Sequence, residues 1–443
     1  TITGRSVDWV RGGAGGPKAN RVTGKRMEAA DGQPANPISG TSQRSEASSQ
    51  EPNLMQLTGM IKRCGSVRDL ALLVRQYRGK LNHIHISAAW GSLARMHRPW
   101  RVLSGNVGRN ARREEAALAE ALGGRTREVL LQMGGREIAN VVHSQASLHI
   151  AQRARADAAL VDALLARAEE HARERAEDFK AQEIANLVWA LAKMDVRVPR
   201  GLFDSLSARA VQDKEMFDPQ GIANLLWAVA KMDVVADATL IQAMVQQAIA
   251  VSGRFNPQGV TNLMWALAKM EIPPDAGLVG AMGDRAMVLV DDFNAQNIAN
   301  MMWALAKMGA PASPGVLMAM ERRAVAISGD FKPQEIAILL WVYGALGEKP
   351  GEGLLEAILL RVTETSQDFD PQGITTLLRA LVTLGVAPSV ALMTGMEARA
   401  TAVADAFSTV HAHSLLAALE ILRGAPDPAL RAALLRDDVP EVA

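Results

Sequence analysis

Apolar and polar positions recur along this chain with a fixed period of 38 residues. The pattern of the segment Phe217–Met232, with the sequence FDPQGIANLLWAVAKM, occurs in six copies from residue 179 onward without an insertion or deletion between them. A fixed period of this length predicts a stacked array of identical helical units. The aromatic residue that opens each copy shows the register: Phe179, Phe217, Phe255, Phe293, Phe331, Phe369 and Phe407.

Each unit is predicted to contain two helices. The first begins at Pro219 and its equivalents, because proline suits the first turn, and Asp218 or Asn256 before it can cap the helix. The second begins near Leu202 and its equivalents and ends at a cation such as Arg285, which we expect to face the negative end of the helix dipole. The fold class is therefore all-α, an α-solenoid of 38-residue helix-turn-helix repeats.

A helical wheel separates two faces on the first helix of each unit. Ile184, Leu187, Val188 and Leu191 share one face, which must pack on the second helix and on a neighbouring unit. The side chains of the opposite face fall within roughly 60° of one another on the wheel, and copies of them in successive units should form parallel ladders along the array. It carries Gln182, Asn186, Trp189, Lys193 and their equivalents.

The repeated motif reads Phe-x-Pro-Gln-x-Ile-Ala-Asn-x-x-Trp-Ala-x-Ala-Lys-Met. It resembles that of the octotricopeptide repeat family of algal and related organelles. That family is itself similar to the repeats of animal Fas-activated-kinase-like mitochondrial proteins. The resemblance covers residues 179–406, about half of the chain. It implies an α-solenoid that binds organellar RNA, with roughly one nucleotide per unit, and that acts in transcript stability, processing or translation.

Four regions follow from these patterns. Residues 1–52 are rich in small and polar residues and predict a disordered, low-complexity segment, either a linker or the remnant of a transit sequence. Residues 53–178 contain two degenerate units, with Trp90 and His143 at the tryptophan position, separated by insertions. Residues 179–406 form the six regular units, and 407–443 a capping unit and tail.

Charge is divided unevenly along the chain. Residues 1–175 carry 27 Lys and Arg against 16 Asp and Glu, a net charge of +11, whereas residues 176–443 carry 21 against 31, a net charge of −10. A nucleic-acid binder normally presents a basic surface. Binding of RNA by the array therefore requires its lysines to gather on one surface while the acidic residues face elsewhere.

The tryptophan ladder has two readings. Its rings could stack on bases, or each Trp could wedge between neighbouring helices. The structural reading is favoured, because a residue that is the same in each of five units cannot discriminate bases.

A residue that reads bases must instead vary from unit to unit. The position after the repeated Gln does, and it shares a face with the repeated Asn, which gives way to Ile338 and Thr376 in the last two units. Two explanations of that change are equally good: the polar face loses its function toward the C-terminus, or the repeat sequence simply diverges as it approaches the capping unit. The predicted RNA-binding residues are Glu183, Asn186, Lys193, Gly221, Asn224, Lys231, Gly259, Asn262, Lys269, Asn297, Asn300, Lys307 and Glu335.

Signals for chemistry are weak. The single cysteine, Cys64, excludes an intramolecular disulfide and a cysteine zinc site and favours a reducing compartment. His83 and His85 lack companions at metal-ligand spacing, and the glycine-rich segment 12–18 fails the phosphate-loop pattern. We expect no catalytic residue, metal, cofactor, small-molecule substrate or membrane span.

Two hypotheses follow. The first is an organellar protein, in the chloroplast stroma or the mitochondrial matrix, that masks single-stranded RNA by occupancy. The second is a protein-binding scaffold, such as a subunit or assembly factor of an organellar ribosome, which the acidic array favours. Partners would be single-stranded RNA in the first case, and ribonucleoprotein or ribosomal proteins in the second.

Overall fold

The computed structural model describes residues 52–96, 105–152, 157–310 and 314–435. The predicted low-complexity segment at 1–52 therefore lies outside the described residues, except for Pro52. Within the described ranges, no helix is both long and apolar enough to span a lipid bilayer.

The chain divides into two compact units, one of residues 1–130 and 144–158 and the other of residues 131–143 and 159–443. The helices of the first are α1 (Leu54–Arg63), α2 (Val67–Tyr77), α3 (His83–Met96) and α4 (Gly105–Val129), with the 3-10 turns η1 (Arg78–Lys80) and η3 (Leu130–Gln132). Helix α5 (Gly135–Gln152) contributes residues to both units, and α6 (Ala158–Glu174) follows it. In the first unit Trp90 is buried, and its indole N–H donates to Thr126 Oγ1 at 2.9 Å.

The second unit contains the repeats. Their first helices are α7 (Ala181–Lys193), α9 (Pro219–Met232), α11 (Pro257–Lys269), α13 (Ala295–Met308), α15 (Pro333–Leu346), α17 (Pro371–Leu384) and α19 (Thr409–Arg423). Their second helices are α8 (Arg200–Gln212), α10 (Ala238–Ala250), α12 (Ala276–Val288), α14 (Pro314–Ala326), α16 (Glu352–Glu364), α18 (Val390–Ala402) and α20 (Pro428–Leu434).

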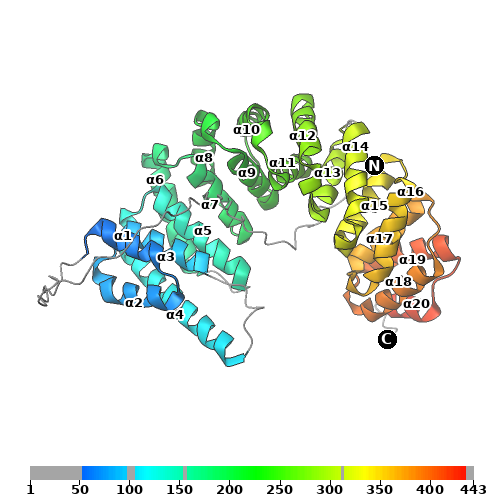
Figure 1. Cartoon of the computed structure of the whole chain (residues 1–443), viewed down its shortest axis with the longest axis horizontal. Helices are drawn as coiled ribbons and strands as arrows, with labels where there is room; N and C mark the ends of the chain where they lie inside the picture. Colours follow the sequence, from blue (N-terminus) through cyan, green and yellow to red (C-terminus); the bar gives the residue numbers. More distant parts are fainter. Residues whose placement is uncertain (1–51, 97–104, 153–156, 311–313, 436–443) are drawn as a thin grey trace, which may run out of the picture. The chain divides into compact units, whose positions relative to one another are not determined.

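These helices form two layers. From α7 to α19 each first helix packs against the first helix of the next unit, and from α8 to α20 the second helices do the same (Figure 1). The predicted α-solenoid is therefore confirmed. The apolar face deduced from the wheel is its core, since Ile184, Leu187, Val188 and Leu191 are all buried.

The helix starts follow the predicted capping chemistry. Asp218 and Asn256 accept hydrogen bonds from the backbone N–H groups of Gly221 and Gly259, both at 2.7 Å, and proline occupies the next position. A 3-10 turn precedes each first helix of the regular repeats, and the phenylalanine after it is buried with 0–1% exposure from Phe179 to Phe369. The 3-10 turns are η4 (Ala176–Asp178), η5 (Lys214–Met216), η6 (Ser252–Arg254), η7 (Val290–Asp292), η8 (Ser328–Asp330), η9 (Ser366–Asp368) and η10 (Ala404–Ala406).

In four of the regular units, the arginine near the end of the second helix has a more specific role than the predicted interaction with the helix dipole. Its Nε donates to the backbone carbonyl of the buried phenylalanine of the same unit, whereas Arg209 of the first regular unit pairs with Asp213. The pairs are Arg285–Phe255, Arg323–Phe293, Arg361–Phe331 and Arg399–Phe369, at 2.8–3.0 Å. Gln247 replaces arginine in the second regular unit and donates to Phe217 at 3.1 Å. We call this contact the arginine clamp.

Candidate nucleic-acid interface

The ladder face is the side of α7, α9, α11, α13, α15 and α17 that carries the repeated Gln, Asn, Trp and Lys positions. Its glutamines are exposed from Gln182 to Gln296, whereas its asparagines are half-buried. The tryptophans lie deeper than the wheel suggests: Trp227 and Trp265 are 5% and 8% exposed, and Trp341 reaches 37%. The face is therefore a partly open surface with aromatic rings at its floor.

The four asparagines of this face share an unusual feature. Their side chains are half-buried, and none forms a hydrogen bond with another side chain or backbone group in the described parts of the chain. An amide offers two donors and an acceptor, and these amides remain accessible to solvent, since none of their atoms is among the buried unpaired ones. The equivalent residues of the last two repeats are the buried Ile338 and the half-buried Thr376. The four are Asn186, Asn224, Asn262 and Asn300.

Aromatic rings and lysines alternate along the N-terminal part of the ladder face. His143 stacks on Trp189 with 5.1 Å between ring centroids, which extends the ladder into α5. The ammonium group of Lys193 lies 5.6 Å from the Trp189 ring centroid and 4.3 Å from that of Trp227, so it is held between two units. Trp265 and Trp303 approach to 6.3 Å. These contacts hold neighbouring helices together, in agreement with the structural reading of the tryptophans.

Acidic residues stand beside the lysines at the ends of the first helices. Lys231 Nζ pairs with Asp195 Oδ1 at 2.5 Å and donates to the Ala192 carbonyl at 2.7 Å. Two units later, Lys307 Nζ pairs with Glu271 at 3.1 Å. Each pair joins the lysine of one unit to the acid that ends the preceding first helix. Such a lysine is therefore already engaged before any ligand arrives.

These acids occupy a strained backbone position. Asp195, Asp233 and Glu271 have φ of +55°, +53° and +56°, and the later units have glycine there, at Gly309 and its equivalents. A side chain in this conformation costs about 1–2 kcal/mol, whereas an exposed ion pair returns about 0–1 kcal/mol. The acids are 79% and 75% exposed, whereas the side chains of Lys231 and Lys307 are 22% and 42% exposed. The ion pair by itself therefore does not offset the backbone cost of an acid at this position.

The structure corrects the prediction for the variable position after the repeated Gln. This position is the third residue of each first helix and packs against the cap. Asn297 is 8% exposed, donates to Thr261 and accepts from the Asn294 backbone, and Glu335 is 9% exposed and accepts from the Lys332 backbone at 2.9 Å. Buried capping residues of this kind cannot line an open groove.

The remaining residues at this position fit the same explanation. A Cβ on Gly259 would lie 3.0 Å from the buried Phe255 ring and 3.2 Å from Asn256, and Gly221 and Gly373 are similarly confined. Glycine is therefore present because the cap and the phenylalanine leave little room. Glu183 is half-buried, with one carboxylate oxygen buried and unpaired within the described residues.

Two sets of the predicted RNA-binding residues do lie on the ladder face. They are the four asparagines and the four lysines Lys193, Lys231, Lys269 and Lys307. Lys269 is half-buried and has no ion pair within the described residues, although Asp233 stands in the matching register. Burial lowers the pKa of Lys193, the charge of Lys231 lowers it further, and Asp195 acts in the opposite direction.

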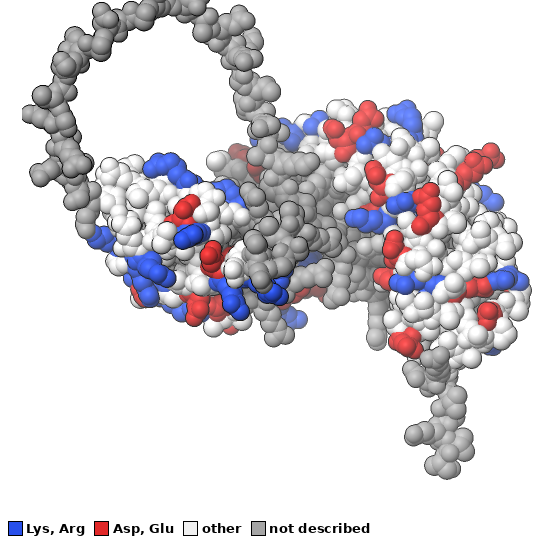
Figure 2. Space-filling view, turned by 60° about the horizontal axis from the view of Figure 1, so that its bottom comes forward, with Lys and Arg blue, Asp and Glu red and all other residues white. Residues whose placement is uncertain are grey.

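The surface charge is mixed. In the view of Figure 2, basic and acidic side chains are interspersed over the C-terminal helices, without a continuous stripe of either sign. Within the described residues, no group of three or more His, Cys, Asp or Glu side chains has the arrangement of a metal site. His85 is buried, and its Nε2 lies 2.9 Å from the Leu54 carbonyl oxygen.

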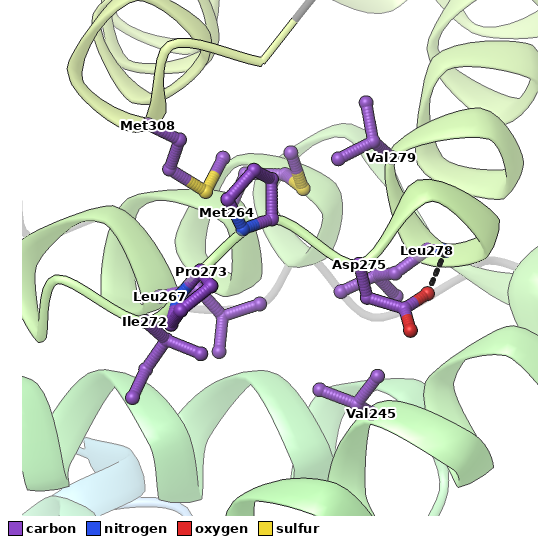
Figure 3. Close-up of a pocket in the computed structure, with 10 residues that line it drawn as sticks. Val245, Met264, Leu267, Ile272, Pro273, Asp275, Leu278, Val279 and Met308 are labelled. Atoms are coloured by element: carbon purple, nitrogen blue, oxygen red, sulfur yellow. Dashed lines mark hydrogen bonds between the residues drawn. The ribbon is translucent and has the colours of Figure 1, made fainter.

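A small, partly open cavity lies between α10, α11, α12 and α13 (Figure 3). It has a volume of about 40 Å³, and Val245, Met264, Leu278 and Met308 line it. Its walls offer few polar atoms, so it is a packing defect between units.

Sequence reasoning missed two features of this surface, the acids beside the lysines and the stack of His143 on Trp189, and it missed the arginine clamp elsewhere in the array. The acids did leave a signal, because they recur at 38-residue spacing and are followed in register by glycines. Their pairing with the next unit requires the packed array.

Comparison with known proteins identifies one family. The model of the family described as RNA-editing substrate-binding complex 6 protein matches residues 111–237 and 235–424. No curated protein matches the sequence. An engineered protein of known crystal structure aligns over 86% of this chain and 97% of its own, at 11% identity and a TM-score of 0.20, a likeness too low to carry an argument. The match supports an RNA-associated helical repeat family, and the octotricopeptide assignment stays a prediction.

Proposed function

This chain belongs to the RNA-editing substrate-binding complex 6 protein family, and from that premise we propose that it binds single-stranded RNA on its ladder face as a component of an organellar RNA–protein complex. It acts by occupancy, without catalysis or cofactor. By covering a stretch of transcript, it affects that transcript's stability, processing or translation.

The observation that carries the proposal is the row of four asparagines at unit spacing, whose amides lack partners within the described residues. Unstacked bases of single-stranded RNA present donors and acceptors on their edges, which amides can bind. Lysines on the same face supply ammonium groups for phosphate contacts. The constant pitch of the array spaces these groups at regular intervals, which supports binding of a single extended strand.

The test is binding of fluorescent single-stranded RNA by wild type and by the double variant Asn224→Ala/Asn262→Ala. Neither side chain has a hydrogen bond to lose within the described chain, so the fold should be preserved. We expect affinity to fall at least about fivefold, with Gln242→Ala, an exposed residue of α10, as the matched control. Unchanged affinity in the double variant contradicts the proposed face. Crosslinking in the organelle and sequencing of the bound RNA then identifies the transcript.

A second candidate is a protein-binding scaffold, such as a subunit or assembly factor of an organellar ribosome. The net charge of −10 over residues 176–443 favours it, because RNA binding is normally supported by a basic surface. Isolation of the protein complex before and after ribonuclease treatment separates the two. A scaffold keeps its partners when the RNA is removed.

A further inference from the structure

The acid and lysine positions of the ladder face vary together within this one chain. Where the next unit has a lysine, the preceding first helix ends in an acid; where that lysine is replaced, the helix ends in glycine. The acid–lysine positions are Asp195 and Lys231, Asp233 and Lys269, and Glu271 and Lys307. The corresponding later positions are Gly309 and Ala345, Gly347 and Thr383, and Gly385 and Ile421.

The unpartnered asparagines stop at the same boundary. They occupy α7, α9, α11 and α13, and the lysines occupy the same four helices. The residues that hold the array together continue beyond it: Phe331 and Phe369 are fully buried, and the arginine clamp is present at Arg361 and Arg399. Drift of the whole repeat toward the C-terminal end would have affected both sets.

Resting on the proposed function, we propose that the RNA site is confined to α7, α9, α11 and α13 and holds about four nucleotides. In the free protein, carboxylates occupy it at Lys231 and Lys307, and RNA phosphates displace these carboxylates from the two lysines. The acids were shown above to contribute little to stability. Their presence only in register with lysines assigns them to the binding step, where Asp195 and Glu271 hold the ammonium groups of Lys231 and Lys307 in position and lower the affinity for anions.

The unit spacing fits one nucleotide per unit. The ring centroids of Trp265 and Trp303, which are equivalent positions of adjacent units, lie 6.3 Å apart. The axes of neighbouring packed helices lie about 8–10 Å apart. Both distances exceed the ~3.4 Å rise per nucleotide of a stacked strand, so one nucleotide per unit requires an unstacked strand. An unstacked strand presents the base edges that the asparagines require.

The first experiment measures the affinity of the full chain for single-stranded RNA of two, four, six and eight nucleotides. We expect a steep rise up to four nucleotides. From four to eight, the gain should not exceed about fivefold, the number of registers that an eight-nucleotide strand offers to a four-nucleotide site. A steep rise that continues to eight nucleotides overturns the inference while leaving the proposed function intact. Absence of binding at every length overturns both.

A gain-of-function variant tests the boundary. Ala345→Lys adds a lysine to α15 at an exposed position of the ladder face. It should raise the affinity for six nucleotides about fivefold at 0.1 M salt, the counterion-release contribution of one phosphate contact, and have little effect on four. Thr363→Lys, an exposed residue of α16, is the charge-matched control. Equal gains from the two variants contradict a defined track.

The acids are tested by neutral isosteres. Asp195→Asn with Glu271→Gln should raise RNA affinity about two- to fivefold and make the salt dependence steeper, because the lysines no longer have a competing anion. Asp284→Asn, an exposed residue of α12, should change affinity less than about twofold. A similar rise in both, or none in either, overturns the role of the acids. Tighter binding of an acidic peptide than of RNA identifies a protein ligand and also overturns the inference.

Discussion

The arginine clamp makes a prediction that separates it from a helix-dipole interaction. Arg323 Nε donates to the Phe293 carbonyl at 3.0 Å, and the Phe293 ring is fully buried at the start of α13. Replacement of Arg323 by Met keeps much of the aliphatic packing and removes the donor. A hydrogen bond from a charged group contributes about 1.5–3 kcal/mol. Because this contact is only partly buried, we expect Arg323→Met to lower the free energy of unfolding by about 1.5–2 kcal/mol.

The neighbouring residue is the control. Arg322 is exposed and has no interaction within the described residues, so Arg322→Met should lie within about 0.5 kcal/mol of wild type. Arg323→Lys keeps the positive charge at the helix end but changes the donor geometry. If the clamp is the cause, lysine should not restore wild-type stability. If the helix dipole is the cause, lysine should restore it.

Urea unfolding followed by far-UV circular dichroism measures the global change. Since repeat arrays open locally, hydrogen exchange of peptides from α13 and α14 should show the loss of protection first, with α7 and α8 little affected. Equal stability of the two methionine variants, or loss of protection spread evenly over the array, would refute the reasoning.

Three further predictions concern the same array. Val245→Ile adds a methylene to the cavity of about 40 Å³ and should raise the free energy of unfolding by about 0.8 kcal/mol in a urea titration. Val288→Ile, at an exposed position, should not raise it. A lower free energy of unfolding in Val245→Ile would mean that the cavity does not accept the added group. Burial lowers the pKa of His143 below the ordinary value of about 6.5, so the neutral ring contributes stability above that pH, and this stability is lost as the pH falls through the folded pKa. His143→Phe keeps a ring on Trp189, so between about pH 7 and 5 it should lose less stability than wild type. Parallel curves of stability against pH for the two proteins would contradict this. Asn297→Ala removes a capping contact and should lower thermal stability by about 1 kcal/mol without weakening RNA binding; a selective loss of binding would restore this residue to the interface.

The cap residues show why part of the site could not be read from the sequence. From the sequence alone, variation at the position after the repeated Gln resembles a base-recognition code. In the folded protein, the same position lies between the N-cap and a buried phenylalanine, so Gly259 is confined and Asn297 is hydrogen-bonded. Variation there reflects which side chains fit a capping contact. Similarly, the tryptophans share a wheel face with exposed glutamines, yet neighbouring helices cover Trp227 and Trp265.

The sequence alone determined the repeat, the two helices of each unit and their boundaries, because hydrophobic periodicity, proline position and capping residues act over a few residues. Helix α9 runs from Pro219 to Met232, as the pattern predicts. Only the tertiary structure decided which polar residues remain available. The pairing of Lys231 with Asp195 and the burial of Glu335 depend on contacts with neighbouring chain segments, and stacking of the units brings together residues that lie 36 positions apart.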